Sequence, residues 1–159
     1  MTITEDKARL TELLDDSQRD MLALVQPLNQ EQMIYAGGGW RVKDIIAHIL
    51  AWEEKMTQSL QAYRDGGEYR FSDFATDDDA NEYFFRQHHD DPSDAIYTNW
   101  AALRTRFKAL INELSPTQFE GVFVFPWGER QTITYLIKHD LIPHVQGHRV
   151  DIQKVLAGE

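Results

Sequence analysis

Cysteine is absent from the 159 residues of this sequence. Its absence excludes a disulfide framework, a zinc site built on thiolates and a cysteine nucleophile. No apolar run is long enough to span a membrane. The first residues also lack the basic and apolar regions of a secretion signal. Together these absences predict a soluble protein located in the cytoplasm.

Positive charge is scarce. There are 16 lysines and arginines against 26 aspartates and glutamates, which gives a formal net charge of −10. Proteins that bind nucleic acids or anionic membranes usually present a basic surface, so this balance argues against both kinds of partner. A Ser-His-Asp elbow, a phosphate-binding glycine loop and a dinucleotide fingerprint are also missing. We therefore expect a single domain over residues 1–159 that takes a small-molecule substrate.

Apolar residues recur every three or four positions in four long stretches, which is the period of an amphipathic helix. The stretches cover roughly residues 4–27, 41–65, 92–114 and 132–156. At 1.5 Å per residue, each helix would be about 35 Å long. Helices of equal length can match their apolar stripes end to end. The sequence therefore predicts an all-α fold, an up-and-down four-helix bundle with one longer crossover between helices 2 and 3.

Local signals mark the ends of these helices. Thr2 and Glu5 have the spacing of a capping box at the start of the first helix. Asp91 is expected to cap the third helix, with Pro92 at the first helical position. Pro143 lies inside the fourth helix, where it predicts a kink or a local break in the hydrogen-bond ladder.

The connections carry weaker signals. Residues 29–39 have the composition of a loop, and residues 121–128 that of a short extended segment. The crossover before residue 91 holds an acidic run and one short predicted helix, at residues 80–87. Connections this long are uncommon in a small domain and often serve as lids or binding loops. A solvated linker without a function is the alternative, and the sequence favours neither.

Two histidines interrupt the inner stripe of the fourth helix. His144 and His148 stand where the pattern expects leucine, and their spacing of four places both rings on one face. On the second helix, His48 lies beside the apolar stripe, one turn from both Asp44 and Trp52. The two helices would thus bring three imidazole rings to a shared inner site.

Three converging imidazoles indicate a metal centre. Buried imidazoles without partners are costly, and a divalent ion would offset that cost. Three histidines also leave positions open for water or substrate, as in catalytic sites. Zinc or nickel is the expected ion, with iron or copper as alternatives. Asp44 and Asp140, each one turn before a histidine, are candidates to fix a ring tautomer. The competing interpretation is that these are ordinary core or surface histidines.

Aromatic residues are the candidates for the walls of a cavity. Trp52 and Tyr135 are more typical of a core, whereas Trp127 stands in a Pro-Trp-Gly turn and could form a roof. Together the three would line a ligand site. No motif marks the general acid or base, for which Asp140 and Glu53 are the candidates.

The segment from Gly38 to Glu53 resembles the second-helix signature of the DinB-like proteins, and more narrowly that of the ClbS/DfsB group. The segment with Asn81, the third helix and the final pair of histidines follow in the expected order. The resemblance implies a bundle in which His48, His144 and His148 bind a divalent metal, and it adds Asn81 to the pocket. Serine is common in the family at the position of Arg41, so a different group has to cap the second helix here.

The resemblance also suggests activities. The wider superfamily includes thiol-dependent transferases and isomerases, and the ClbS/DfsB group is associated with hydrolytic detoxification of a reactive genotoxic metabolite. Members are often dimers, which makes a homodimer the expected oligomer. The first hypothesis is therefore a metal-dependent hydrolase or transferase that acts on a small reactive molecule. A ligand-binding or sequestering protein without catalysis is the second, and a structural module with core histidines is the third.

Overall fold

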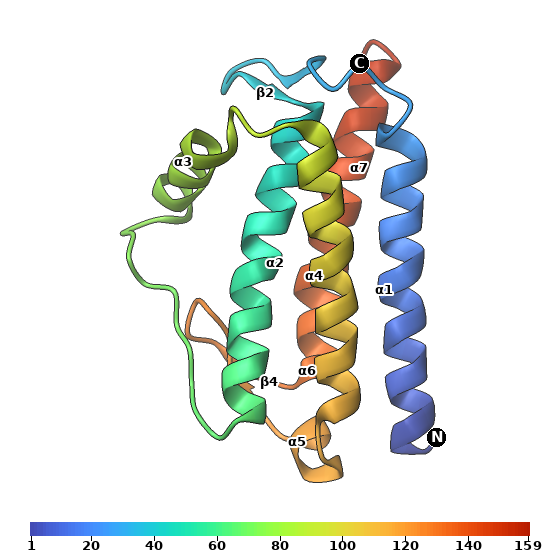
Figure 1. The fold of residues 1–159 in the computed structure, drawn as a ribbon, viewed down its shortest axis with the longest axis vertical. Coiled ribbons are helices and arrows are strands. Elements are labelled where there is room, and N and C mark those ends of the chain that lie inside the picture. The colour runs from blue at the N-terminus through green and yellow to red at the C-terminus, as the bar shows by residue number, and fades with distance from the viewer.

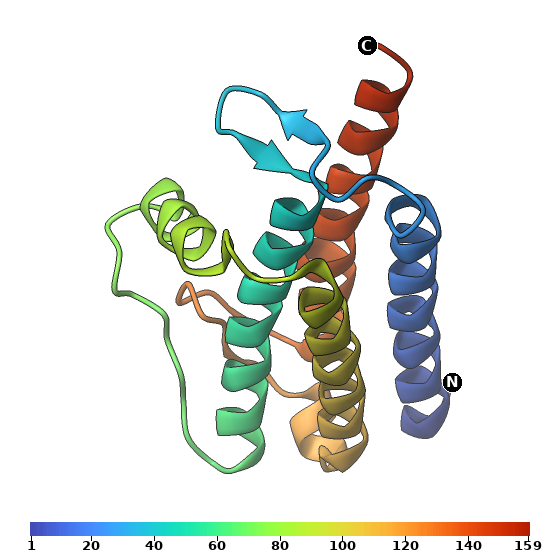
Figure 2. The ribbon, with the colours of Figure 1, turned by 45° about the horizontal axis from the view of Figure 1, so that its top comes forward.

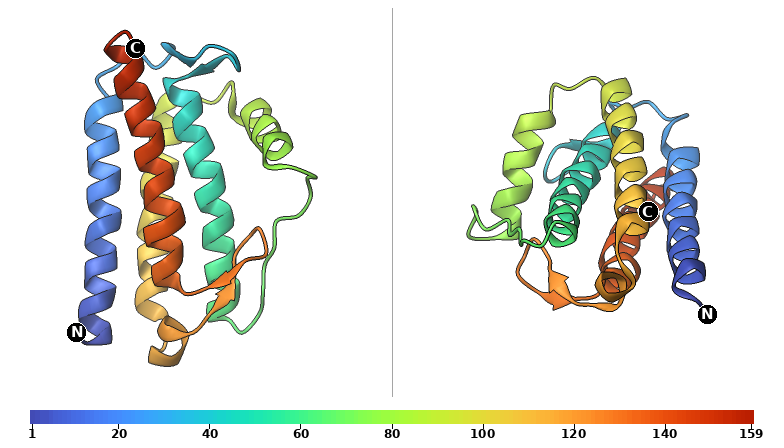
Figure 3. Two further views of the ribbon diagram at one scale, coloured as in Figure 1. Left: turned by 180° about the vertical axis from the view of Figure 1, so that it is seen from behind. Right: turned by 60° about the horizontal axis from the view of Figure 1, so that its bottom comes forward.

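Four long helical segments lie alongside one another in the computed structural model, which describes residues 1–159 (Figure 1). They are α1 (Ile3–Val25), α2 (Val42–Arg64), α4 (Ser93–Glu113) and the continuous run of α6 (Ile133–Tyr135), η1 (Leu136–Leu141) and α7 (Ile142–Leu156). α2 packs chiefly on α4, and α1 on α7, as the view from behind illustrates (Figure 3). The fold is all-α, as predicted. None of the helices combines the length and the apolar character that crossing a membrane requires.

The crossover between α2 and α4 decides the directions of the helices. Residues 65–76 run back along the outside of α2 to α3 (Asp77–His88), which lies beside the upper half of α2 (Figure 1). The chain therefore enters α4 at the same end as α2, and these two helices run parallel. The order is up, down, down, up, whereas the expected up-and-down label implies strict alternation. The predicted crossover is itself the reason for this difference.

The first two helices start with different caps. Oγ1 of Thr2 accepts from the backbone N–H of Glu5, and the Glu5 carboxylate accepts from the N–H of Thr2, so the predicted capping box is confirmed. α2 follows Arg41, which has no acceptor to offer. The Asp44 carboxylate instead accepts from the backbone N–H of Arg41, at 2.9 Å.

The predicted cap of the third helix is wrong. α4 begins at Ser93, and Pro92 precedes it as the capping residue without a side-chain hydrogen bond. The Asp91 carboxylate does not cap the helix and instead lies 2.8 Å from Nδ1 of His88.

Two short hairpins form in segments that lie outside the long helices. β1 (Met33–Tyr35) pairs antiparallel with β2 (Trp40–Arg41), so the segment expected to be a loop is partly strand. β3 (Phe123–Val124), within the predicted extended segment, pairs with β4 (Arg130–Gln131). A short helix, α5 (Pro116–Glu120), precedes β3. Figure 2 shows the β1–β2 hairpin beside the C-terminal half of α7.

The core has two large apolar clusters with a buried ion pair between them, and a third, small cluster where α3 packs on α2. Along α2, Leu50 belongs to one cluster and Met56 to the other. Glu53 lies between these levels and forms a two-point salt bridge with Arg104 of α4, at 2.6 and 3.1 Å. It also accepts from Nε1 of Trp100, at 3.0 Å. The α4 side chains thus occupy the Glu53 carboxylate, and its predicted role as the acid or base is wrong.

The last long helix is interrupted before Pro143, as predicted. Leu136–Leu141 form a π-helix, and the N–H of Ile142 donates to the carbonyl oxygen of Ile137. Pro143 has no N–H with which to continue a regular ladder. The break therefore takes the form of a wider turn within a continuous helix.

Candidate metal centre

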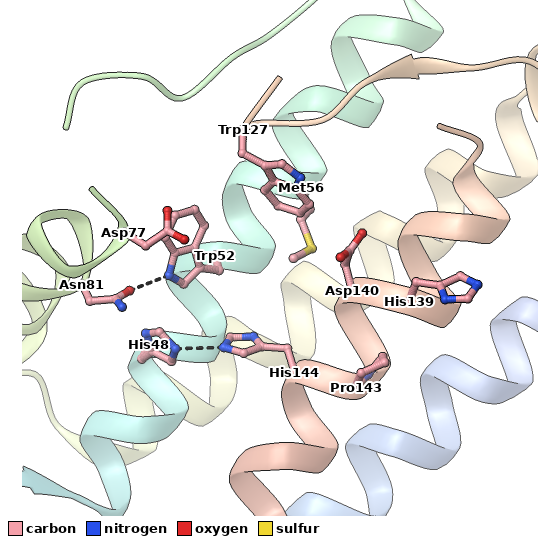
Figure 4. Close-up of a pocket in the computed structure, with 10 residues that line it drawn as sticks. All are labelled: His48, Trp52, Met56, Asp77, Asn81, Trp127, His139, Asp140, Pro143 and His144. Carbon is pink, nitrogen blue, oxygen red and sulfur yellow. Dashed lines mark hydrogen bonds between the residues drawn. The ribbon is translucent and has the colours of Figure 1, made fainter. Parts of the chain in front are cut away.

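Three histidines converge between α2 and α7. His48 projects from α2 and is 8% exposed, whereas His144 and His148 project from α7. Nε2 of His144 lies 2.9 Å from Nε2 of His48 and 3.0 Å from Nε2 of His148. Figure 4 shows the rings of His48 and His144 facing each other across the gap between their helices. The structure thus brings together the rings that the sequence analysis grouped.

The β1–β2 hairpin holds the third ring. Tyr35 donates its O–H to Oδ2 of Asp151 at 2.6 Å, so its oxygen accepts from Nδ1 of His148, 2.8 Å away. Burial and the Asp151 acceptor raise the pKa of Tyr35, which keeps the phenol protonated. His148 therefore carries its proton on Nδ1 and turns the lone pair of Nε2 toward the other two rings. Partners of this kind commonly fix the tautomer of a metal-binding histidine.

The three rings are neutral near physiological pH. Burial lowers the pKa of His48 to about 2, and the neighbouring His144 and His148 contribute. Burial lowers the pKa of His144 to about 4. For His148, burial and the neighbouring His144 lower the pKa to about 4, against a smaller upward effect of Asp151. A neutral imidazole is the form that binds a metal ion.

Without a cation, the rings cannot satisfy one another. Each neutral ring has one N–H, so Nε2 of His144 can form a proper hydrogen bond with one neighbour only. The other contact then has no hydrogen between its two nitrogens. Nitrogen ligands about 2.0–2.1 Å from one ion are themselves about 3 Å apart. Two of the three nitrogen pairs, at 2.9 and 3.0 Å, agree with that spacing, and all three ligand atoms lie within 4.8 Å of one another. The three histidines thus form a group that could hold a divalent ion.

A cavity of about 560 Å³ lies directly beside His48 and His144. The pocket residues Trp52, Asn81, Trp127 and Asp140 line it (Figure 4). Nε1–H of Trp52 donates to Oδ1 of Asn81 at 2.7 Å, which joins α2 to α3. α3 thus forms one wall, so part of the crossover borders the site instead of being wholly solvated.

Asp140 lines this cavity and has one carboxylate oxygen without a partner. Oδ2 of Asp140 is buried and has no hydrogen-bond partner. Burial raises the pKa of Asp140, and the negative charge of Glu129 raises it further. The carboxylate makes no hydrogen bond to His144, so it does not orient that ring.

A sequence profile of the DinB superfamily matches residues 13–149. The chain belongs to the DinB superfamily. Divalent metal binding is frequent in this superfamily, and the three histidines form a group able to hold such an ion. No functionally curated protein matches the sequence.

A solved structure shares this fold. The crystal structure of an uncharacterised protein from Escherichia coli UTI89 superposes with a TM-score of 0.76 at 14% sequence identity. The superposition covers 96% of this chain and 93% of the other. At this identity the similarity concerns the fold alone.

Two predicted site residues of this DinB superfamily chain lie elsewhere. Both carboxylate oxygens of Asp44 accept from the Arg41 side chain, at 2.7 and 3.0 Å. Nδ1 of His48 has no partner, so the tautomer role predicted for Asp44 is wrong. Tyr135 does not line the cavity. It stacks on His139 with 4.3 Å between ring centroids and packs against one of the apolar clusters.

Tyr35 and Asp151 contact the centre and were not among the predicted residues. Asp151 stands three residues after His148, a spacing that places an acid beside the ring and could have indicated it. Tyr35 had no comparable signal, because it lies 113 residues before His148 in a segment read as a loop.

Proposed function

We propose that this protein is a metal-dependent enzyme of the ClbS/DfsB type, which hydrolyses a small reactive molecule or transfers a group to it. The observation that carries the proposal is the meeting of three Nε2 atoms at the edge of a cavity of about 560 Å³. A structural metal site would be closed by a fourth protein ligand, whereas three ligands beside a cavity suit catalysis.

Metal binding and ring orientation fall to different residues. His48, His144 and His148 would hold the ion, and Tyr35 with Asp151 orients the last of these rings. When bound, a divalent ion lowers the pKa of water toward about 7 and polarises a substrate carbonyl.

Asp140 is the acidic residue that we place against the substrate. Its side chain lines the cavity, its buried Oδ2 has no partner, and burial together with the charge of Glu129 raises its pKa. Trp52 and Trp127 give the cavity an aromatic lining.

Zinc or nickel is the ion we propose, because neutral imidazoles suit both; iron or copper would fit the same donors. We also assign the four long helical segments to the bundle architecture of this family, and we propose a homodimer in the cytoplasm. Light scattering of the purified protein tests the oligomeric state.

The test starts from protein purified without a histidine tag, with metal content measured by elemental analysis. We expect about one divalent ion per chain, and its loss in His48→Ala, His144→Ala and His148→Ala. His88→Ala is the matched control, since His88 contacts Asp91 outside the centre. Hydrolysis of p-nitrophenyl acetate and conjugation of glutathione to monochlorobimane serve as probe reactions.

Full metal content in His144→Ala would overturn the assignment of the ligands. Probe reactions that continue unchanged after chelation would overturn the metal-dependent chemistry. A metal-free protein that binds the probes without turnover would favour the alternative, a sequestering protein.

A further inference from the structure

The cavity beside the histidines has an acidic and aromatic wall. Asp77 and Asp140 line it, and no lysine or arginine does. The Arg70 guanidinium lies beside Gly128 and is not part of the lining. The chain as a whole carries a net charge of −10, which draws cations toward such a concave surface.

Two residues that line this cavity each have a polar atom without a partner within the protein. Oδ2 of Asp140 is buried without a donor, and Nδ1 of His48 is buried on a side chain that is 8% exposed. Unpaired buried polar atoms are unfavourable, so each one indicates a group that a ligand would supply. The carboxylate oxygen accepts hydrogen bonds, and a protonated nitrogen is the donor that would satisfy it best.

The two indoles present ring faces instead of donors. Nε1–H of Trp52 is used by Asn81 at 2.7 Å, and Nε1–H of Trp127 by Glu129 at 3.3 Å. What both residues offer to the cavity is therefore aromatic surface (Figure 4). Aromatic faces attract cationic nitrogen, and indole attracts it most strongly.

From these observations we infer that the substrate carries a protonated amine or another cationic nitrogen group, which binds between the indoles and the Asp140 carboxylate. The inference rests on the proposed function, because it places the reacting, electron-rich group at the histidines and the cationic group about one helical turn away, at Asp140. It excludes substrates whose far end is a carboxylate or a phosphate, since Asp77 and Asp140 would repel them.

The experiment uses three probes of similar size that differ in charge: phenethylamine as the cation, phenethyl alcohol as the neutral compound and hydrocinnamate as the anion. Dissociation constants are measured on the full chain after EDTA treatment, from the NMR shifts of the indole N–H signals of Trp52 and Trp127. We expect the amine to bind about tenfold more tightly than the alcohol, and the anion to bind most weakly.

Two variants locate the preference. Asp140→Asn keeps the shape of the side chain and should remove the preference for the amine. Asp78→Asn is the matched control and should keep it, because Asp78 is exposed on α3 and does not line the cavity. Equal binding of the three probes by the unaltered protein would overturn the inference without any variant, as would a preference that survives Asp140→Asn.

The outcome is separate from that of the metal test. A preference for the amine in a protein that never binds metal would leave this inference standing while the proposed enzyme function fails. A metal-binding protein without the preference would give the opposite result.

Discussion

The hydroxyl oxygen of Tyr35 lies 2.8 Å from Nδ1 of His148, although the two residues are 113 positions apart. Because Tyr35 donates its only proton to Asp151, this contact fixes the His148 tautomer. Tyr35→Phe should therefore weaken metal binding about 10–100-fold, the usual effect of losing such a partner. Competition with a chromophoric chelator measures the dissociation constant.

The matched control for this change is Tyr97→Phe. Tyr97 donates to Oε1 of Gln30 at 2.6 Å and has no contact with the histidines, so its loss should leave metal affinity unchanged. Equal metal affinity in Tyr35→Phe and the unaltered protein would mean that His148 needs no help from the hairpin.

Stability of the metal-free protein should fall as the pH drops below about 6.5, the usual pKa of histidine in an unfolded chain. Below that pH the three imidazoles are protonated in the unfolded state but stay neutral in the folded state. This difference persists down to about pH 4 for His144 and His148 and about pH 2 for His48. For each such imidazole, the free energy of unfolding falls by about 1.4 kcal/mol per pH unit. Urea midpoints at a series of pH values measure the slope.

The comparison for this slope is a triple variant in which His48, His144 and His148 are leucine. It cannot take up these protons in either state, so its stability should depend less on pH between about 6.5 and 4. The two proteins should differ most at the acid end. Parallel curves would contradict the prediction.

Glu53→Gln should destabilise the fold by about 3–5 kcal/mol, because it leaves the Arg104 guanidinium buried without a counter-charge. Metal content should not change, since Glu53 is bonded to α4 side chains and not to the histidines. Chemical denaturation and elemental analysis measure the two effects. Glu68→Gln, which removes an exposed partner of Arg130, is the control and should have little effect.

Asn81→Leu should loosen α3 from α2. The variant removes the acceptor of the Trp52 indole N–H, at a cost of about 1 kcal/mol. Hydrogen exchange of the amides in Asp77–His88 should become faster. Gln87→Leu, on the exposed side of the same helix, should leave the exchange unaltered. Unchanged exchange in Asn81→Leu would show that aromatic packing alone holds α3.

Much of the fold follows from local signals in the sequence. The period of the apolar residues predicts the long helices, and Thr2 with Glu5 predicts where the first one starts. The spacing of four predicts that His144 and His148 share one face of their helix, and the apolar stripe of α2 predicts an inward-facing His48. The direction in which the pair faces also depends on the π-helix before it. Proline at 143 predicts a disturbed ladder, though not its π form, which depends on how the surrounding core packs.

The remaining features depend on partners that are distant in sequence. Glu53 looks like a free acid until Arg104, 51 residues later, takes both of its oxygens. Asp44 has the spacing of a partner for His48, but its two carboxylate oxygens accept from the charged guanidinium of Arg41 instead. Asp91 has the position of a cap, yet a neighbouring histidine engages it. In each case the spacing in the sequence indicates an acidic residue with a polar role but predicts the wrong partner for it.

The wider turn at Leu136–Leu141 accommodates one residue more than a regular turn, so all that follows is rotated by about 100° relative to an uninterrupted α-helix. His144 and His148 face α2 only while this phase shift persists. Deletion of a single residue in that stretch would restore the regular helix and turn both rings away, although all three histidines of the centre are kept. Length changes between β4 and Pro143 are therefore a greater threat to the centre than most substitutions there.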